Sequence, residues 1–152
     1  FCTGMKRSTT AVDVKEIRYM LEDQVGYLLR QASQRHTALF QKIVPMDLTP
    51  TQFAALVKLA ELGECSQNDL GRRTSMDVAT IKGVVERLRA KGLVDIKSDP
   101  KDKRRTIISI PAEHAQIVPE LHAAGHTISN LTLSPLSSAE QKSLLRLLKK
   151  LS

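Results

Sequence analysis

The chain has 152 residues, and 23 lysines and arginines against 16 aspartates and glutamates give it a formal net charge of +7, which favours a polyanionic partner. Its residues are 41% hydrophobic but only 3% aromatic, without tryptophan, so we expect an aliphatic core of the kind found in helical proteins. No apolar run approaches the roughly 20 residues of a membrane span, and we recognise no secretory signal, phosphate loop or catalytic constellation; we therefore expect a cytoplasmic protein, not an enzyme, with no cofactor, no bound metal and no membrane partner.

The first predicted element is a long amphipathic helix between Val14 and Val44, where apolar residues recur at steps of three and four. Pro45 ends it, because proline lacks the amide donor and disfavours helix at the residue before it. A flexible segment, residues 1–13, precedes this helix. We assign residues 14–47 and 111–152 to a helical dimerisation region and residues 48–110 to a DNA-binding domain.

The DNA-binding domain opens with a helix start, because Thr49 can cap, Pro50 can take the first helical position and Gln52 can close a capping box. Gly63 stops that helix. Ser66 begins a short helix next.

A second helix of this domain is capped by Asp77 and carries Ile81, Val85 and Leu88 on its predicted core face. Its outward residues are then free for a partner. Together with the short helix before it, this forms a helix-turn-helix.

A basic β-hairpin follows, in which one apolar strand around residues 93–96 pairs with another over 107–110. The loop between them holds two aspartates and five basic residues and is a predicted wing. Residues 66–105 carry eleven basic and six acidic side chains, so they hold +5 of the net charge of +7. The charge is thus concentrated on the unit that would read DNA.

Two more helices complete the chain, one from Pro111 to about Leu131 and one whose start at Ser137 has capping-box spacing to Glu140. Their leucine-rich faces, like that of the first helix, would stay wet in a monomer, and burial at about 25 cal/mol per Å² favours a homodimer. A two-fold dimer sets two recognition helices about 34 Å apart, which predicts a palindromic operator in double-stranded DNA. The predicted fold class is mainly α with a small β-hairpin wing.

The order of these motifs resembles the MarR (multiple antibiotic resistance regulator) family of winged helix-turn-helix transcription factors. The resemblance rests on Leu48-Thr49-Pro50-Thr51-Gln52-Phe53, the Asp99-Pro100-x-Asp102-x-Arg104 wing and the closing Leu136-Ser137-Ser138-Ala139-Glu140-Gln141, and it runs from about Glu16 to Leu151. The chain departs from the family's common Leu-Gly turn, with Thr74 and Ser75 in its place.

The resemblance implies that the second helix of the motif enters the major groove and that the wing meets the minor groove or the backbone. Arg104 would insert into the minor groove, steered by Asp102, and small residues would touch base edges. Five basic residues suit phosphates: Lys82, Arg87, Lys101, Lys103 and Arg105. The remaining predicted DNA-binding residues are Ser66, Gln67, Val78, Ala79 and Thr80.

Many members of the family are repressors that release DNA when a small aromatic carboxylate binds, and this chain is similar to those in which a helix-1 Arg is followed six positions later by His. The predicted ligand residues are Tyr27, Arg30, Gln31 and His36. An Arg fork can hold a carboxylate, and a His can bond a ring hydroxyl. The alternative stays open that Arg30 and His36, about 120° apart on one helix, are an interface cation and a surface residue. The implied function is a repressor of a catabolic operon for an aromatic compound.

Two other switches are possible on the sequence. Cys65 could serve a redox-sensing repressor, although a reactive thiol needs a lowered pKa and the neighbouring Glu61 and Glu64 would raise it. His122 and His126, four residues apart and near His114, could serve a zinc-responsive repressor, or be solvated or dimer-facing histidines.

Overall fold

A computed structural model of the chain describes residues 18–152. The predicted flexible segment 1–13 and residues 14–17 of the predicted first helix lie outside the described part. The described residues form six α-helices, three 3₁₀ turns and three strands, so the mainly α fold with a small wing is confirmed. Their bounds are η1 Leu21–Asp23, α1 Val25–Ile43, η2 Pro45–Asp47, α2 Pro50–Leu62, β1 Glu64–Ser66, α3 Gln67–Arg73, α4 Val78–Ala90, β2 Asp95–Ser98, β3 Thr106–Ser109, η3 Ala112–His114, α5 Ile117–Leu133 and α6 Ser138–Leu151.

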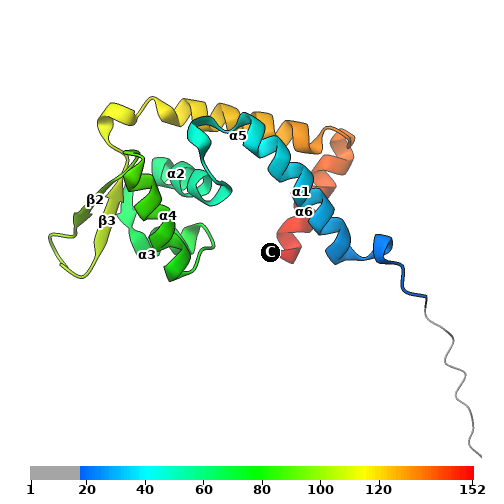
Figure 1. The fold of residues 1–152 in the computed structure, drawn as a ribbon, viewed down its shortest axis with the longest axis horizontal. Coiled ribbons are helices and arrows are strands. Elements are labelled where there is room, and N and C mark those ends of the chain that lie inside the picture. The colour runs from blue at the N-terminus through cyan, green and yellow to red at the C-terminus, as the bar shows by residue number, and fades with distance from the viewer. Residues whose placement is uncertain (1–17) are drawn as a thin grey trace, which may run out of the picture.

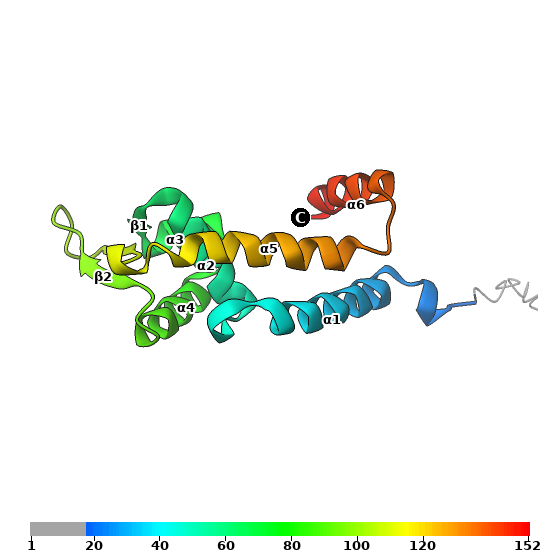
Figure 2. The ribbon, with the colours of Figure 1, turned by 90° about the horizontal axis from the view of Figure 1, so that it is seen from above.

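The elements divide into a lobe and a set of long helices. Figures 1 and 2 both show α2, α3, α4 and the hairpin gathered at one end, with α1 and α6 at the other. Helix α5 runs from the lobe to the far end and packs beside α1. The two parts are therefore joined by α5 and by the connector between α1 and α2.

Helix α1 begins later than the predicted start at Val14. Gln24 has extended backbone angles (φ −86°, ψ 134°) and its side chain donates to the Met20 carbonyl at 2.8 Å, so the chain turns before Val25. The apolar spacing continues through this break, and spacing alone could not reveal it. The helix ends at Ile43, ahead of Pro45, as predicted.

The predicted capping signals are confirmed. Thr49 Oγ1 accepts the Gln52 amide at 3.3 Å while Gln52 Oε1 accepts the Thr49 amide at 3.2 Å, which is a complete capping box. Ser137 and Glu140 form the same reciprocal pair at the start of α6. Each box satisfies amides that have no partner inside their helix.

The turn between α3 and α4 has no glycine at its left-handed position. Ser75 takes the left-handed conformation (φ 56°), and the Thr74 hydroxyl donates to the Leu70 carbonyl at 2.7 Å. The Met76 amide then bonds the Gly71 carbonyl at 2.8 Å. The hydroxyl of Thr74 thus fixes the turn locally.

The sheet has one strand more than the predicted hairpin. Its order is β1-β3-β2, all antiparallel, with Cys65 opposite Ile108 and Ile96 opposite Ile108 on the other side. The hairpin strand starts at Asp95, since the Leu93 amide still bonds the Leu88 carbonyl of α4 at 3.0 Å. The additional strand ties the wing to the start of α3.

The core lies in the lobe. Its fully buried side chains come from α2, α3, α4, β3 and α5: Leu56, Leu59, Leu70, Ile81, Val85, Leu88, Ile108 and Leu121. The predicted core face of α4 is therefore confirmed. By contrast, α1 buries only Phe40, and α6 buries no residue.

The helix predicted from Pro111 starts six residues later. Pro111 leads into the 3₁₀ turn η3, and α5 begins at Ile117. The signal was misplaced because a proline that favours a helix start fits a 3₁₀ turn equally well.

The connector between α1 and α2 has an unusual backbone. Met46 (φ 60°) and Asp47 (φ 51°) are consecutive left-handed residues that are not glycine. Their carbonyls both accept from Lys91 Nζ, at 3.0 and 2.9 Å, and Lys91 is the C-cap of α4. One ammonium group therefore links the end of α4 to the connector.

Candidate nucleic-acid interface and ligand pocket

The start of α4 is the exposed apex of the helix-turn-helix. Asp77 Oδ1 accepts the Thr80 amide at 2.7 Å, and this hydrogen bond lowers the pKa of the Asp77 carboxyl. The side chains of Val78, Ala79 and Thr80 are exposed, Val78 at 68%. The start of α4 therefore presents three small side chains to solvent.

The predicted phosphate contacts on α4 are exposed on either side of its buried face, about 140° apart around the helix axis. Lys82 and Arg87 are exposed, whereas Val84 and Leu88 are buried. The helix packs so closely on α3 that a Cβ on Gly71 would lie 2.9 Å from the Ile81 methyl group. The exposed face is thus fixed by a tight contact on the opposite face.

The wing is held by its two aspartates. Asp102 Oδ1 accepts the Arg104 amide at 3.0 Å, and the Arg105 amide donates to the Asp102 carbonyl at 2.9 Å. Asp99 accepts the Lys101 amide at 2.9 Å and lies 3.9 Å from the Arg105 guanidinium. Asp102 therefore orders the backbone that carries Arg104, and Asp99 has a similar part that the sequence analysis missed.

The wing presents its cations to solvent. The side chains from residue 101 to residue 105 are all exposed. Of these, Arg105 also lies near Asp99, while no described carboxylate forms an ion pair with Arg104. The predicted contacts that this loop brings together are Lys101, Asp102, Lys103, Arg104 and Arg105.

The two predicted DNA contacts at the start of α3, Ser66 and Gln67, differ in how far they are buried. Ser66 is buried and its Oγ accepts the Asp69 amide at 3.2 Å, so its hydroxyl caps the helix. Gln67 is half-buried beside it. Asp69 in turn pairs with Arg72 and, at 2.9 Å, with Arg73, which lowers the pKa of its carboxyl. Burial makes Ser66 a structural residue within this chain.

Cys65 is a half-buried free thiol in β1. Burial raises its pKa, with the Asp69 carboxylate as a second cause that outweighs the opposite effect of Arg73. The expected direction is confirmed, but its causes are burial and Asp69, where the sequence suggested Glu61 and Glu64. A raised pKa leaves little thiolate for oxidation at neutral pH, which disfavours the redox alternative.

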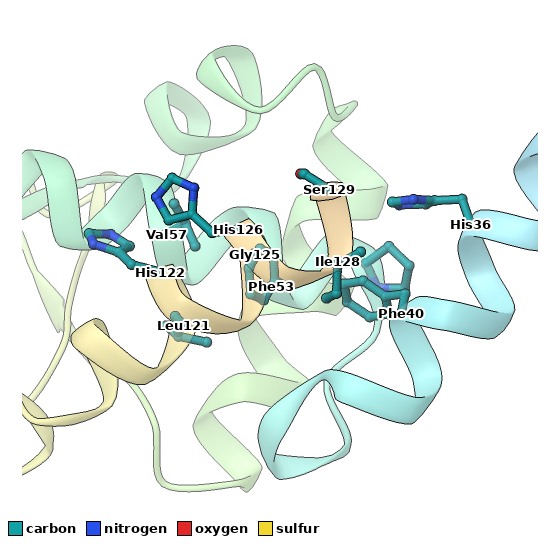
Figure 3. A pocket seen from close by; sticks show the side chains of 11 residues that line it. His36, Phe40, Phe53, Val57, Leu121, His122, Gly125, His126, Ile128 and Ser129 are labelled. Atoms are coloured by element: carbon teal, nitrogen blue, oxygen red, sulfur yellow. The ribbon is translucent and has the colours of Figure 1, made fainter. Parts of the chain in front are cut away.

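A cavity of about 560 Å³ lies between α1, α2 and α5, where the long helices meet the lobe. Its floor is apolar: the lining includes Phe40, Pro50, Phe53, Val57, Leu121 and Ile128. Its described polar side chains are three histidines and one serine. Figure 3 shows His36 at one side and His122 and His126 at the other, with Ser129 on α5.

His36, the histidine that α1 contributes to the cavity, is hydrogen-bonded to the C-terminal end of α5. His36 Nδ1 lies 2.9 Å from Thr132 Oγ1, and its ring lies near Phe40, with centroids 6.4 Å apart. The adjacent Arg35 donates to the carbonyls of Leu131, at 2.9 Å, and Thr132. A cation at the carbonyl end of a helix is favoured by the helix dipole, so Arg35 caps α5.

Of the four predicted ligand residues, His36 alone lines this cavity. Tyr27 accepts a hydrogen bond from Gln31 at 3.0 Å, and the Arg30 guanidinium lies 5.5 Å from the Tyr27 ring centroid. Six helical residues separate Arg30 from His36 by about 9 Å along the axis and about 120° around it. In the single chain these three residues form a neighbouring surface on α1, outside the pocket.

His122 and His126 of α5 line the pocket, a role that the sequence analysis did not predict, because it considered them only as zinc ligands or as solvated or dimer-facing residues. Within residues 18–152, no group of three or more His, Cys, Asp or Glu side chains is arranged to hold a metal ion. Among the same residues, no helix combines the length and the apolar character of a membrane span. His122 and His126 lie one helical turn apart, and each directly follows another pocket residue, Leu121 or Gly125. This spacing is the sequence pattern that could have indicated a shared pocket.

An exposed helix start and a basic hairpin, carried on a core of three helices and a small sheet, define a winged helix-turn-helix regulator of transcription. The family profile described as MarR family matches residues 46–105. The chain is 37% identical to the HTH-type transcriptional repressor NicR of Pseudomonas putida, over 96% of this chain and 93% of NicR.

Solved structures agree. A probable transcriptional regulator from Pseudomonas aeruginosa is 49% identical with a TM-score of 0.83, over 88% of this chain and 100% of that one. BpsR of Bordetella bronchiseptica, whose DNA binding is regulated by 6-hydroxynicotinic acid, is 37% identical with a TM-score of 0.81, over 88% and 96%. The chain belongs to the MarR family, and the prediction that it is a regulator and not an enzyme is confirmed.

Proposed function

We propose that the protein is a homodimeric repressor that binds a palindromic operator and is released by a small aromatic carboxylate, controlling a catabolic operon for an aromatic compound. The observation that supports this most is the cavity at the joint between the lobe and the long helices. A ligand there contacts α1, α2 and α5 together, so it can change the spacing of two recognition helices. The similarity to NicR and to BpsR supports the same function.

The proposed DNA contacts combine α4 with the wing. Val78, Ala79 and Thr80 would meet base edges, since small side chains can approach thymine methyls. Arg104 would enter the minor groove, where a guanidinium is favoured. The exposed cations Lys82, Arg87, Lys101, Lys103 and Arg105 would contact phosphates, and Gln67 would approach the backbone from the start of α3.

Pairing of two chains would cover the open apolar faces. Leu145, Leu147 and Leu148 of α6 are 49%, 46% and 37% exposed, and Leu28 and Leu29 of α1 are 49% and 48% exposed. A free chain would leave these leucines in water, at a cost that burial removes. We propose that α1, α5 and α6 form the dimerisation region.

The ligand would sit with its ring on the apolar floor of the cavity and its acid group toward the open side. Phe40 and Phe53, with centroids 5.6 Å apart in an edge-on arrangement, offer aromatic contacts. His122 and His126 are exposed at the cavity and can donate to a carboxylate. The cavity volume suits one small aromatic acid.

Arg30 does not line the cavity of its own chain, so in this proposal it acts on the cavity of the second chain. Its guanidinium is exposed on α1 and its described contact is the Tyr27 ring, so no described carboxylate neutralises it. We propose that Arg30 of the partner subunit, with Tyr27 and Gln31 beside it, completes the acid end of the cavity.

A mixed dimer tests that arrangement. A chain carrying Arg30→Ala is paired with a chain carrying His36→Ala, each with its own affinity tag, and the bound ligand is counted by calorimetry. If Arg30 acts across the dimer, one intact cavity is restored and each mixed dimer binds one ligand. If both residues serve the same chain's cavity, neither cavity is intact and no ligand binds.

The whole function is tested with the full-length protein and its own promoter DNA. We expect a shifted palindromic fragment, and we expect 6-hydroxynicotinate or 4-hydroxybenzoate to reverse the shift. A ligand at 100 times its Kd would also stabilise the protein by about 2.7 kcal/mol in a thermal assay. Failure of every aromatic acid to move either readout would refute the ligand, and absence of any shift would refute the operator.

A further inference from the structure

The connector between α1 and α2, residues 44–49, joins two helices that both line the cavity. Phe40, in the last turn of α1, and Pro50, the first residue of α2, are cavity residues on either side of it. A ligand in the cavity therefore touches the chain close to both ends of the connector. Any movement of these two helix ends relative to each other has to be taken up by the connector.

The backbone of the connector is held in a conformation that its residues disfavour. Met46 and Asp47 follow one another with φ of 60° and 51°, in the left-handed region that a side chain makes unfavourable. Such a conformation persists where surrounding contacts hold it. Leu48 is buried in the core, and the carbonyls of Met46 and Asp47 both accept from the Lys91 ammonium. Without that ammonium, the connector is free to relax toward ordinary backbone angles.

Lys91 reaches the connector through carbonyl oxygens and not through an ion pair. Its Nζ lies 3.0 Å from the Met46 carbonyl oxygen and 2.9 Å from that of Asp47, and a charged donor strengthens both bonds. The ion pairs described for residues 18–152 do not include Lys91. Within the same residues, these two bonds are the only side-chain hydrogen bonds from α4 or its caps to another element.

Helix α4 is fixed at two points along its length. Near its start, Ile81 packs against Gly71 so closely that a Cβ there would lie 2.9 Å from the Ile81 methyl group. At its end, Lys91 is bound to the connector, and the two points lie about 15 Å apart along the helix axis. A rigid helix held in this way keeps one angle to the lobe. A shift of the second point turns the helix about the first, together with the exposed residues from Val78 to Thr80.

We infer that Lys91 couples the cavity to the recognition helix: a ligand displaces the connector, and the two carbonyl bonds carry that displacement to the end of α4. Lys91 does not line the cavity and lies at the opposite end of α4 from its exposed start, so it is a positioning residue. A ligand releases DNA only through its different affinity for two arrangements of the protein. The inference rests on the proposed function, since it states how a ligand in the same cavity changes the angle of α4.

The coupling is measured on the full-length protein with its promoter fragment. The coupling factor is the Kd for the operator in saturating 6-hydroxynicotinate or 4-hydroxybenzoate, divided by the Kd without the acid. By linkage, the same factor relates the affinities of the acid for the free and the operator-bound protein, so two titrations give one number. Lys91→Met removes the ammonium and keeps an unbranched apolar stem. We expect its coupling factor to be about threefold smaller or less than that, with the acid still bound by the free protein.

This ratio separates coupling from a merely structural role. A variant that is only less stable, or that has lost one phosphate contact, binds the operator more weakly with and without the acid, and the loss cancels in the ratio. Lys91→Arg keeps donors that can reach both carbonyls and should keep the coupling factor within about twofold.

Two further variants are matched controls. Asp47→Asn removes the carboxylate but keeps the carbonyl that accepts from Lys91, so it should leave the coupling factor unchanged. Lys42→Met removes an exposed cation of α1, and no hydrogen bond of the Lys42 side chain is described within residues 18–152. It should also leave the factor unchanged, because it alters the net charge by the same amount as Lys91→Met.

Amide hydrogen exchange of the unsubstituted protein, followed by NMR, is a second measurement that needs no variant. Addition of 6-hydroxynicotinate should change the exchange of the Leu48 amide in the connector and of the Lys91 amide at the end of α4, which bond the Pro45 and Arg87 carbonyls. A change at Leu48 without a change at Lys91 would overturn the inference.

The outcomes distinguish this inference from the proposed function. Equal coupling factors in the unsubstituted protein and in Lys91→Met would refute the role of Lys91 and leave the proposed function intact. An equal fall in Lys42→Met would assign the effect to net charge and refute that role as well. If neither acid weakens operator binding by the unsubstituted protein, the inference fails together with the proposed function.

Discussion

Substitution of Gly71 by alanine probes the contact that fixes the recognition helix. A Cβ at this position would lie 2.9 Å from Ile81 Cγ2 and 3.1 Å from the Met76 carbonyl oxygen. The Ile81 methyl group could shift. The Met76 carbonyl belongs to the backbone of the turn between α3 and α4 and cannot move away as easily. Overpacking of this kind costs about 1–3 kcal/mol, and the better helix propensity of alanine returns about 1 kcal/mol. We expect Gly71→Ala to lower the free energy of unfolding by about 0–2 kcal/mol, the balance of these two effects.

Gly83→Ala is the matched control, because nothing lies within 4 Å of its added Cβ in the middle of α4. It should raise stability by about 0.5–1 kcal/mol through propensity alone. Both variants are compared by urea unfolding at one fixed protein concentration, with circular dichroism as the signal. If Gly71→Ala is as stable as Gly83→Ala, which has the propensity gain without the close contact, the tight packing of α3 on α4 does not limit the fold and the reasoning fails.

Other expectations concern the pocket, the wing and the helix cap. Gly125→Ala would place a Cβ 3.2 Å from Phe53 Cζ, so the added methyl group crowds a ring that lines the cavity; calorimetry should show ligand affinity reduced about tenfold with little loss of stability, and unchanged affinity would contradict this geometry. Arg104→Ala should weaken operator binding and reduce the salt slope by about one, measured by titration at several salt concentrations. Asp102→Ala removes the acceptor for the Arg104 amide together with one negative charge of the wing, and should weaken binding about threefold or more although the lost charge by itself favours DNA; unchanged or tighter binding would contradict the ordering role of Asp102. Because the pKa of Asp77 is lowered in the folded protein, its contribution is present above the ordinary carboxyl value of 3.8 and is lost as pH falls through the lowered value. Asp77→Asn keeps the cap and should therefore show a smaller acid-side loss of stability, and an identical acid limb would count against the cap.

The sequence correctly predicted the features that depend on interactions between residues close together in the chain. The capping boxes at Thr49 and Ser137 and the stop at Pro45 depend on bonds within one helical turn, so spacing alone predicts them. The core face of α4 was equally readable from its period. These local rules were enough for the winged helix-turn-helix.

Features made by distant segments were not readable in this way. Strand β1 has three residues and exists because β3 pairs with it across more than 40 positions, which no local pattern records. The cavity combines α1, α2 and α5, so helix spacing could place His36 near His122 and His126 only once the packing was known. The same reason explains why Arg30 was grouped with His36 by sequence and lies on another face of α1.

Helix α6 gives the chain a dependence on its own abundance. It buries no residue within one chain, so packing inside that chain contributes little to holding it in place. If a second copy covers it, folding of these fourteen residues and assembly become one equilibrium, whose midpoint moves with concentration by mass action. A cell that dilutes such a protein would lose operator occupancy more steeply than in proportion to the number of chains, because dimers disappear with the square of the free chain concentration. The abundance of the chain would then act as a second input, alongside the ligand.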